Sequence, residues 1–286
     1  MNYFSTKDSL IVENLDEFNI LNTFECGQCF RFNKIDDFTY RGVVFDKVIS
    51  ISAKNNQYII KGITLNDFEN TFINYFDLNL DYKKIKSELS NISKSLNLAC
   101  NYSQGIRILN QDPWEALCSF IISQNNNIPR IKSIIEKLCL KFGEKIYDNF
   151  YTFPKASVLA TLKESDLNDI KCGFRDKYIL DAARKVSNLE VDLAKISKLA
   201  IKDARNELMK IKGVGPKVAE CELLYGMHRL EAFPIDTWMK KALKTLFSDI
   251  SIENLGQYAG VAQQYIFHYF RMNSKEILES HDGTKD

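Results

Sequence analysis

Two patterns of hydrophobic and polar positions divide the chain. Residues 9–63 alternate between apolar and polar side chains and are rich in β-formers, as in FTYRGVVFDKVISISA, with Asp36-Asp37 and Asn55-Asn56 as turn signals. This alternation predicts an antiparallel sheet of several strands. From Leu65 onward, apolar residues recur every three or four positions, which predicts helices almost without interruption to about residue 272.

The order of these patterns predicts an α+β fold, with a small N-terminal antiparallel sheet packed on a mostly helical body of about nine or ten helices. We expect an N-terminal sheet domain with flanking helices over residues 1–98 and a helical domain over residues 99–274. A helix-hairpin-helix motif is expected at about 204–227. The polar segment 275–286 is expected to be a partly frayed tail.

Composition adds a local charge signal to this picture. The 286 residues include 45% hydrophobic side chains, which suffice for a full core, and the net charge is only +1. Between Lys171 and Lys244, however, 16 Lys and Arg stand against 10 Asp and Glu, which gives +6 there and −5 elsewhere. Such a segment is typical of a surface that meets nucleic acid, although it also suits a solvated helical face.

The cysteines and the N-terminus indicate where in the cell the protein is expected. The N-terminus lacks the basic start and apolar run of a signal peptide, and no run reaches the roughly eighteen apolar residues that cross a bilayer. We therefore expect a cytosolic protein with no membrane partner. The seven cysteines favour reduced, buried thiols. Cys26 and Cys29 form a CxxC pair, but no second pair follows at metal-site spacing, so we assign no metal ligand.

The segment IKGVGPKVAECELLYGMHRLEAFPID places a glycine turn, a lysine and an aspartate between two helical stretches. Gly213 and Gly215 are expected to take positive φ in the turn. Pro216 suits the first position of a helix, so Lys217 falls in the first helical turn. The same residues also suit a plain hairpin, a surface lysine and, at Asp236, an ordinary N-cap.

Lysine is an unusual residue at the start of a helix. The helix dipole disfavours an ammonium there by only about 0.3–1 kcal/mol, whereas burial lowers a lysine pKa by up to roughly 3–5 units. A buried Lys217 is therefore a candidate nucleophile of the Schiff-base type. Asp236 is then a candidate carboxylate to balance positive charge that develops on a reacting sugar.

Four segments together resemble the 8-oxoguanine DNA glycosylase family, in the eukaryotic-type branch of the helix-hairpin-helix superfamily. They are ECGQCFRF from Glu25, ILNQDPWEALCSFIISQNNNIPRI from Ile108, the hairpin with its aspartate, and QYAGVAQQYIF from Gln257. They occur in the family's order over nearly the whole chain. The resemblance implies a bifunctional enzyme that flips 8-oxoguanine out of double-stranded DNA, excises it, preferably opposite cytosine, and nicks the strand by β-elimination.

The resemblance also implies the catalytic and pocket residues. Lys217 attacks C1′ and forms a Schiff base, while Asp236 stabilises the oxocarbenium-like charge. The damaged base lies between the ring of Phe267 and the face of Cys221, and the Gln263 amide reads its Watson–Crick edge.

Discrimination between 8-oxoguanine and guanine concerns one hydrogen atom. Oxidation converts N7 from a hydrogen-bond acceptor into an N–H donor. In the family a main-chain carbonyl faces this atom, and the matching residue is Gly27. A site built around a hydrogen bond rejects an analogue that lacks it far more strongly than a shape filter does.

Other residues match the family's DNA contacts. In the family an asparagine fills the space that the extruded base leaves, and the matching residue is Asn125. Two arginines contact the estranged cytosine, at positions that match Arg130 and Arg175, and an aromatic wedge, matched by Phe174, kinks the duplex. The hairpin amides bind a phosphate; here they are those of Gly213 and Gly215, and Trp238 near the expected catalytic aspartate is a further DNA contact. A metal ion often lies at the family's hairpin carbonyls, but we assign none.

The chain departs from the family pattern at four positions. Phe174 stands where a tyrosine is usual, Trp238 where a histidine contacts phosphate, Tyr225 where a methionine lies near the lysine, and Pro129 where a small residue precedes the arginine. These departures bear on the backbone contacts, on the shape of the base pocket and on the preference for cytosine.

Two alternatives remain beside this interpretation. One is another helix-hairpin-helix glycosylase, for thymine glycol or alkylated purines; iron–sulfur members need four clustered cysteines near the C-terminus, and none lies beyond Cys221. The other is a non-catalytic DNA-binding module. For the glycosylase we expect no cofactor, a monomer, and a cytoplasmic, DNA-associated location if the source is bacterial.

Overall fold

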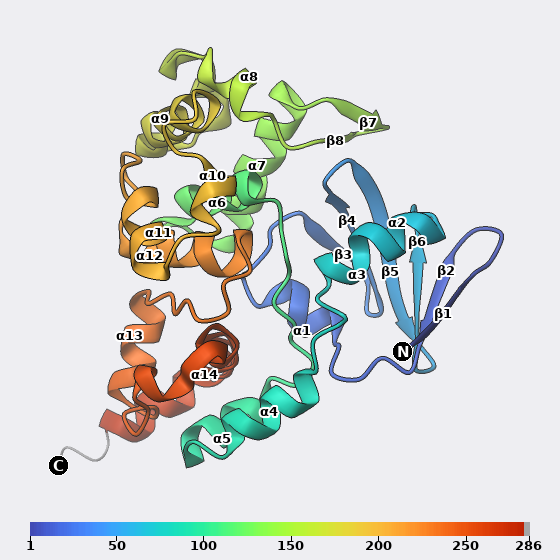
Figure 1. The fold of residues 1–286 in the computed structure, drawn as a ribbon, viewed down its shortest axis with the longest axis vertical. Helices are drawn as coiled ribbons and strands as arrows, with labels where there is room; N and C mark the ends of the chain where they lie inside the picture. The colour runs from blue at the N-terminus through green and yellow to red at the C-terminus, as the bar shows by residue number, and fades with distance from the viewer. Residues whose placement is uncertain (283–286) are drawn as a thin grey trace.

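A six-stranded antiparallel sheet forms the N-terminal part of the computed structural model, which describes residues 1–282 (Figure 1). Its strand order is β1-β2-β6-β5-β4-β3. The predicted sheet is confirmed, although its first strand begins before residue 9 and a short helix interrupts it. The strands are Asn2–Ser5 (β1), Leu10–Glu13 (β2), Phe32–Asp36 (β3), Thr39–Val44 (β4), Lys47–Lys54 (β5) and Gln57–Lys61 (β6).

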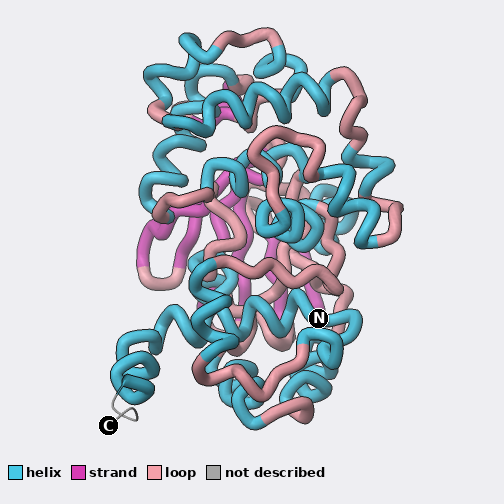
Figure 2. Tube along the Cα trace, turned by 90° about the vertical axis from the view of Figure 1, so that its left-hand side faces the viewer, coloured by secondary structure: helices cyan, strands magenta, loops and turns pink. Residues whose placement is uncertain are grey.

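The rest of the described chain is mostly helical, as predicted, but its helices are shorter and more numerous (Figure 2). A small hairpin of Lys145–Tyr147 (β7) and Phe150–Tyr151 (β8), which the sequence did not predict, interrupts them. The α-helices are Ile20–Glu25 (α1), Leu65–Asp67 (α2), Ile73–Tyr75 (α3), Tyr82–Ser90 (α4), Lys94–Tyr102 (α5), Pro113–Ser123 (α6), Ile128–Phe142 (α7), Ala156–Ala160 (α8), Asp176–Ser187 (α9), Leu193–Ile196 (α10), Ile201–Leu208 (α11), Pro216–Cys221 (α12), Thr237–Lys244 (α13) and Ala259–Asp282 (α14).

Several predicted helices are partly of another type. The stretches Phe68–Phe72 (η1) and Glu222–Gly226 (η4) are π-helical, and Glu164–Ile170 (η2), Gly173–Arg175 (η3) and Ile252–Tyr258 (η5) are 3₁₀-helical. A pattern with apolar residues every three or four positions does not distinguish these types from an α-helix, because all three bury one face.

Two hydrophobic cores hold the molecule together. The sheet closes over an aromatic core in which the rings of Phe24 and Phe32 stack with centroids 3.9 Å apart. The second core fills the helical body and includes buried residues of α4, α5 and α14. Thus α4 and α5 pack with the helical body, although the predicted domain division placed most of their residues with the sheet. That division itself stays a prediction.

The C-terminal segment differs from the expectation. A frayed tail was predicted from residue 275, but α14 continues without interruption to Asp282. Polar residues suffice to extend a helix whose apolar first half is already packed, because each added residue gains a backbone hydrogen bond. The last four residues of the expected tail lie outside the described part of the chain. Within residues 1–282, no helix combines the length and apolar character that a membrane span requires.

The helices α6 and α7 begin at well-defined caps. The Asp112 side chain accepts a hydrogen bond from Glu115 N (2.8 Å) at the start of α6, and that of Asn127 accepts one from Arg130 N (3.0 Å) at the start of α7. Pro129 lies in the first turn of α7, where its missing N–H needs no partner. The proline therefore does not displace the start of the helix.

Glu222 is a buried carboxylic acid at the start of the π-helical stretch η4. It is fully buried, and neither of its carboxyl oxygens has a hydrogen-bond partner among the described residues. Gly226 leaves space for it, since a Cβ atom there would lie 2.5 Å from Glu222 Oε1. Burial raises the pKa of Glu222 well above its ordinary value of 4.5, and the nearby Asp112 adds to the effect.

We expect Glu222→Gln to stabilise the protein, and more so as the pH rises. Above pH 4.5 the unfolded chain loses the Glu222 proton while the folded chain keeps it, so the wild type loses stability by up to about 1.4 kcal/mol per pH unit. The difference in Tm between variant and wild type should therefore widen from pH 5 to pH 8. The exposed Glu253→Gln serves as control, and a difference that stays constant with pH would contradict the argument.

Candidate active site

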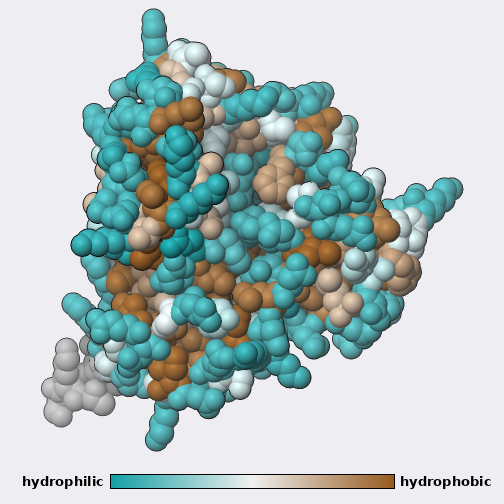
Figure 3. All heavy atoms as spheres, viewed as in Figure 1, coloured by the Kyte–Doolittle hydropathy of each residue, from teal (hydrophilic) through white to brown (hydrophobic). Residues whose placement is uncertain are grey.

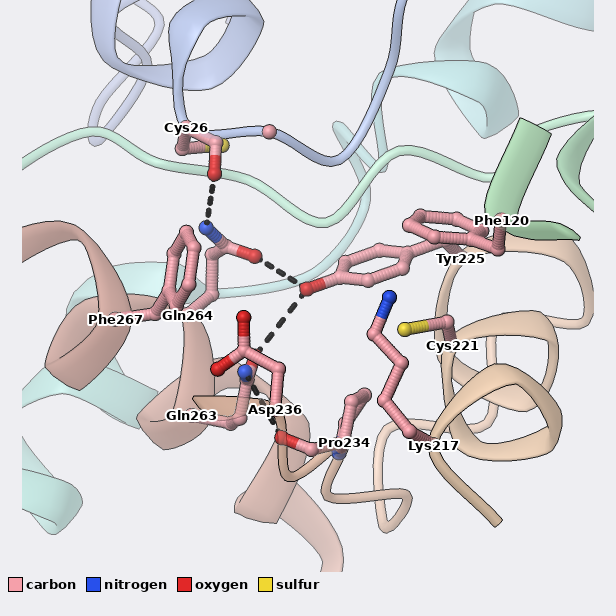
Figure 4. Close-up of a pocket in the computed structure, with 11 residues that line it drawn as sticks. Cys26, Phe120, Lys217, Cys221, Tyr225, Pro234, Asp236, Gln263, Gln264 and Phe267 are labelled. Atoms are coloured by element: carbon pink, nitrogen blue, oxygen red, sulfur yellow. Dashed lines mark hydrogen bonds between the residues drawn. The ribbon is translucent and has the colours of Figure 1, made fainter. Parts of the chain in front are cut away.

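A small pocket lies where the loop after α1 meets the helical body (Figure 4). Its cavity measures about 50 Å³, which is room for only a few water molecules. The residues that line it are Cys26, Gly27, Phe120, Lys217, Cys221, Tyr225, Pro234, Asp236, Gln263, Gln264 and Phe267.

Lys217 reaches the pocket from the first turn of α12. Its side chain is half-buried, and its Nζ donates a hydrogen bond to Ser123 Oγ at 3.0 Å. The Ser123 hydroxyl donates its own hydrogen to Phe120 O (2.8 Å), so its lone pairs are left to accept from the amine. The amine also lies 5.5 Å from the centre of the Phe120 ring. Among the described residues, it forms no ion pair with Asp236 or with another carboxylate.

Asp236 enters the same pocket from the start of α13. It is the N-cap of this helix, and its Oδ1 accepts a hydrogen bond from Met239 N at 2.7 Å. Its second oxygen has no protein partner among the described residues. In Figure 4 the Asp236 carboxylate and the Lys217 amine both point into the cavity from separate elements. The N-cap bond fixes one oxygen and leaves the other available to a ligand.

Cys221 lies one helical turn after Lys217 and is buried. Burial raises the pKa of the thiol to about 11, although the neighbouring Lys217 amine acts in the opposite direction. The thiol is therefore protonated at neutral pH and offers a soft, uncharged face. Phe267 of α14 lines the pocket as well, as Figure 4 shows. The Phe267 ring and the Cys221 thiol thus line the same cavity.

Gly27 and Gln263 complete the predicted pocket residues. Gly27 has a φ of +86°, which favours glycine, and it packs near the Phe267 ring. Gln263 is 4% exposed, and its amide nitrogen donates to Pro234 O at 3.2 Å. All six residues predicted for catalysis and base binding thus line one cavity.

A wider groove of about 560 Å³ opens beside this pocket. It extends from the loop between α6 and α7 to the starts of α12 and α13, and Lys217 and Asp236 border it. Asn125, Gly215 and Trp238, three of the predicted DNA contacts, also line it. Trp238 is 41% exposed, so its ring is free to touch a ligand. On the face in Figure 3, apolar patches interrupt a mostly hydrophilic surface.

The other predicted DNA contacts gather around Arg175. Arg130 is exposed, and one of its nitrogens lies 3.5 Å from Lys171 O. Phe174 is 49% exposed and stacks with Arg175, whose guanidinium carbon lies 4.4 Å from the ring centre. Arg175 itself is only 2% exposed, and its guanidinium donates to the carbonyls of Gln124, Asn125 and Cys172. Its donor fork is therefore largely occupied within the protein.

The hairpin conformation corrects one expectation. Gly213 has a φ of +81°, and a Cβ atom there would lie 2.4 Å from the Tyr178 ring, so glycine is required. Gly215, by contrast, is the N-cap of α12 with ordinary extended backbone angles (φ −99°, ψ −177°). The prediction of positive φ at Gly215 is wrong, because the turn is completed one residue earlier. The open space around it still allows a close approach.

Comparison with known proteins identifies the family. The 8-oxoguanine DNA glycosylase N-terminal domain matches residues 10–117, and the HhH-GPD superfamily base excision DNA repair protein matches residues 118–255. The N-glycosylase/DNA lyase of Saccharomyces cerevisiae is 31% identical over 268 residues, which cover 84% of this chain and 71% of the yeast protein.

Solved structures agree with this result. The Clostridium acetobutylicum 8-oxoguanine glycosylase/lyase, in complex with double-stranded DNA containing cytosine opposite 8-oxoguanine, superposes with a TM-score of 0.90 and 39% identity. MBOgg1 in complex with a low-affinity DNA ligand gives a TM-score of 0.91 and 41% identity. Each alignment covers 96% of this chain and 99% of the other. The chain belongs to the 8-oxoguanine DNA glycosylase family. The resemblance inferred from the four sequence segments is confirmed, and with it membership of a family of DNA glycosylase/AP lyases.

Four residues at this site were not assigned a role from sequence. They are Ser123, which lines the groove and accepts a hydrogen bond from Lys217, and three pocket residues, Phe120, Tyr225 and Gln264. Ser123 ends α6 two residues before Asn125, so its position beside the SQNNN motif was the available signal. Gln264 follows Gln263 directly, and neighbouring helical residues point in different directions, so no local pattern indicated that both side chains lie near the Tyr225 hydroxyl. Among the described residues, no group of three His, Cys, Asp or Glu side chains could hold a metal ion.

Proposed function

We propose that this chain excises 8-oxoguanine from double-stranded DNA by a Lys217 Schiff-base mechanism and then nicks the strand. The single observation that carries the proposal is the convergence of Lys217, Asp236 and the predicted base-binding residues on one pocket beside an open groove. Membership of the glycosylase family supports the reaction class. The relatives named for 8-oxoguanine support the substrate.

In the first step, the Lys217 nitrogen forms a bond to C1′ of the flipped nucleotide while the bond from C1′ to N9 of the base breaks. The neutral amine supplies its lone pair to C1′, the base leaves with the bonding pair on N9, and a proton from the new C1′ ammonium neutralises the base. The Ser123 hydroxyl holds the amine by accepting one of its hydrogens, which keeps the nitrogen aimed into the pocket. Sugar-ring opening then gives the Schiff base, and loss of a C2′ proton expels the 3′ phosphate.

Asp236 is proposed to stabilise positive charge on the sugar as the base leaves. Its Oδ1 is fixed by the cap of α13, so the second oxygen is held without reorganisation at the moment of reaction. A preorganised charge in a site that excludes water contributes more than the same charge in solvent.

Base recognition is proposed to use the four remaining residues. Phe267 and Cys221 would lie against the two faces of the purine, and the protonated thiol adds no charge. Gln263 would pair with the Watson–Crick edge. The Gly27 carbonyl would accept the N7 hydrogen that 8-oxoguanine has and guanine lacks.

Replacement of the nucleophile tests the proposal. Lys217→Gln should retain binding to DNA with 8-oxoguanine but lose both base release and the covalent adduct, because an amide does not form a Schiff base. Borohydride trapping on duplexes with 8-oxoguanine, thymine glycol or 1,N6-ethenoadenine measures this. Lys202→Gln, on the exposed side of α11, is the matched control.

The outcomes separate the alternatives. An adduct on the thymine glycol or ethenoadenine duplex alone would overturn the substrate and favour another glycosylase of the superfamily. Salt-sensitive binding without any cleavage would indicate a non-catalytic DNA-binding module. Undiminished cleavage by Lys217→Gln would contradict the role of the lysine.

Asp236→Asn tests the charge separately from the fold. Asparagine caps a helix about as well as aspartate, so Tm should stay close to that of the wild type. Base release in single-turnover assays should slow by roughly 10²–10³-fold, because the stabilising charge is lost. A matched Asp249→Asn variant, at an exposed carboxylate outside the pocket, should not slow it. A normal rate in Asp236→Asn would exclude the proposed role.

Recognition of the opposite strand is proposed to depend mainly on Arg130. Arg130 is exposed and keeps most of its donors free, whereas Arg175 is buried against the carbonyls of Gln124 and Asn125. We therefore propose that Arg130 contacts the estranged cytosine directly. Arg175 would then contribute mainly by holding the Asn125 loop, and Phe174 would act as the apolar wedge.

We also propose that the enzyme acts as a monomer.

Arg130→Lys tests this division. Lysine keeps the positive charge but loses the planar fork, so the preference for cytosine over the other three opposite bases should fall by about tenfold. Excision rates measured with all four bases opposite 8-oxoguanine provide the readout. An unchanged preference in the variant would show that Arg130 does not read this base.

A further inference from the structure

Tyr225 forms part of the pocket wall without a role in the proposed chemistry. Its side chain is 4% exposed, and its ring stacks on Phe120 with centroids 5.1 Å apart and planes at 22°. It stands in the π-helical stretch η4, directly beyond the helix that carries Lys217 and Cys221. Burial raises the pKa of the Tyr225 hydroxyl well above its ordinary value of 10.0, so the hydroxyl keeps its proton and can donate it.

The Tyr225 hydroxyl meets two glutamine side chains but has one hydrogen to donate (Figure 4). The contact to Gln264 Oε1 is much the shorter, and the contact to Gln263 Oε1 is 3.2 Å. The hydrogen therefore belongs to Gln264. Gln263 Oε1 is therefore left with only a long contact to this hydroxyl, while its Nε2 stays bonded to Pro234 O.

Gln264 links the Tyr225 hydroxyl to the loop that contains Gly27. It is 1% exposed, and its amide nitrogen donates to Cys26 O at 3.1 Å. This carbonyl belongs to the peptide that joins Cys26 to Gly27, so the bond fixes the plane of that peptide. A continuous chain of hydrogen bonds thus runs from Tyr225 through Gln264 to the loop.

Gly27 needs such support because it has no side chain of its own. On its other side, Gln28 is fully buried, and its amide donates to Thr23 O and to Arg107 O while it accepts from Leu109 N (2.9 Å). The loop is therefore anchored on both sides of Gly27: Gln264 holds the Cys26–Gly27 peptide, and the buried side chain of Gln28 holds the next residue. The position of the Gly27 carbonyl follows from these two anchors.

We propose that Tyr225 and Gln264 are positioning residues for lesion discrimination, which hold the Gly27 carbonyl where it meets the N7 hydrogen of 8-oxoguanine. This inference depends on the proposed role of Gly27. Without the Tyr225 hydroxyl, Gln264 Oε1 loses its donor in a buried site, so the amide relaxes and the Cys26 carbonyl is less firmly held. The consequence concerns base recognition more than the reaction of the sugar.

Tyr225→Phe removes the hydroxyl and keeps the ring on Phe120. We expect single-turnover excision of 8-oxoguanine to fall about tenfold, equivalent to about 1.4 kcal/mol. Cleavage of a duplex with a preformed abasic site should fall by a much smaller factor, because no base has to be recognised. The ratio of the two rates is the readout, since a variant that is merely less well folded would lower both alike.

Tyr265→Phe is the matched control. Tyr265 is also a fully buried tyrosine, but its hydroxyl has no hydrogen-bond partner among the described residues and lies outside the pocket. Its replacement should leave the ratio unchanged. If Tyr225→Phe fails to fold, Gln264→Met carries the same test, because it breaks the chain at its second member and retains a side chain of similar length.

The double variant Tyr225→Phe/Gln264→Met adds an independent check. Its loss of excision should be smaller than the product of the two single losses, since both changes break one chain. If the wild type releases no 8-oxoguanine, the proposed function fails and this inference with it. If the wild type does release it, while Tyr225→Phe keeps the wild-type ratio of rates, only the inference is overturned.

Discussion

The pocket depends on the contact of α14 with two parts of the molecule at once. Gln263 donates to Pro234, two residues before Asp236, and Gln264 donates to Cys26 in the loop after α1. A buried amide without partners costs about 1–3 kcal/mol, so the helix has one register in which both glutamines are satisfied. This single register brings Phe267 over the cavity. The loop, the aspartate and the aromatic ring are therefore located by one helix.

The two catalytic candidates both stand at helix N-termini, but the helices affect them in opposite ways. Asp236 caps α13, where the dipole favours a negative charge. Lys217 lies in the first turn of α12, where the dipole disfavours a positive one. The Ser123 hydroxyl then supplies the amine with a neutral partner instead of a carboxylate.

Much of the fold and of the site could be predicted from sequence, for physical reasons that differ from residue to residue. The alternation in β5 and the three-and-four spacing in α7 reflect burial directly, and Cys221 follows Lys217 by four residues, so helix geometry relates these two. The Gly213 conformation could be predicted because few other residues adopt it. Gly215 could not be distinguished from it, since glycine also occurs at ordinary angles.

The remaining features depend on contacts between distant segments. The occupied fork of Arg175 results from carbonyls some fifty positions earlier in the chain, and the bond from Gln264 to Cys26 joins residues at opposite ends. Likewise, the helix that continues through the polar residues after 274 follows from the anchoring of its first half. No local pattern contains this information, because tertiary packing decides it.

Contacts within the protein organise the loop that carries Asn125. Asn125 has a φ of +47°, a conformation that asparagine tolerates better than most residues, and the buried Arg175 holds its carbonyl at 2.9 Å. A flexible loop would lose conformational entropy on entering a duplex, at roughly 1–2 kcal/mol for each backbone residue that becomes fixed. The contacts of Asn125 impose that order during folding, so a loop with the role expected of Asn125 would probe one base pair after another without refolding at each encounter.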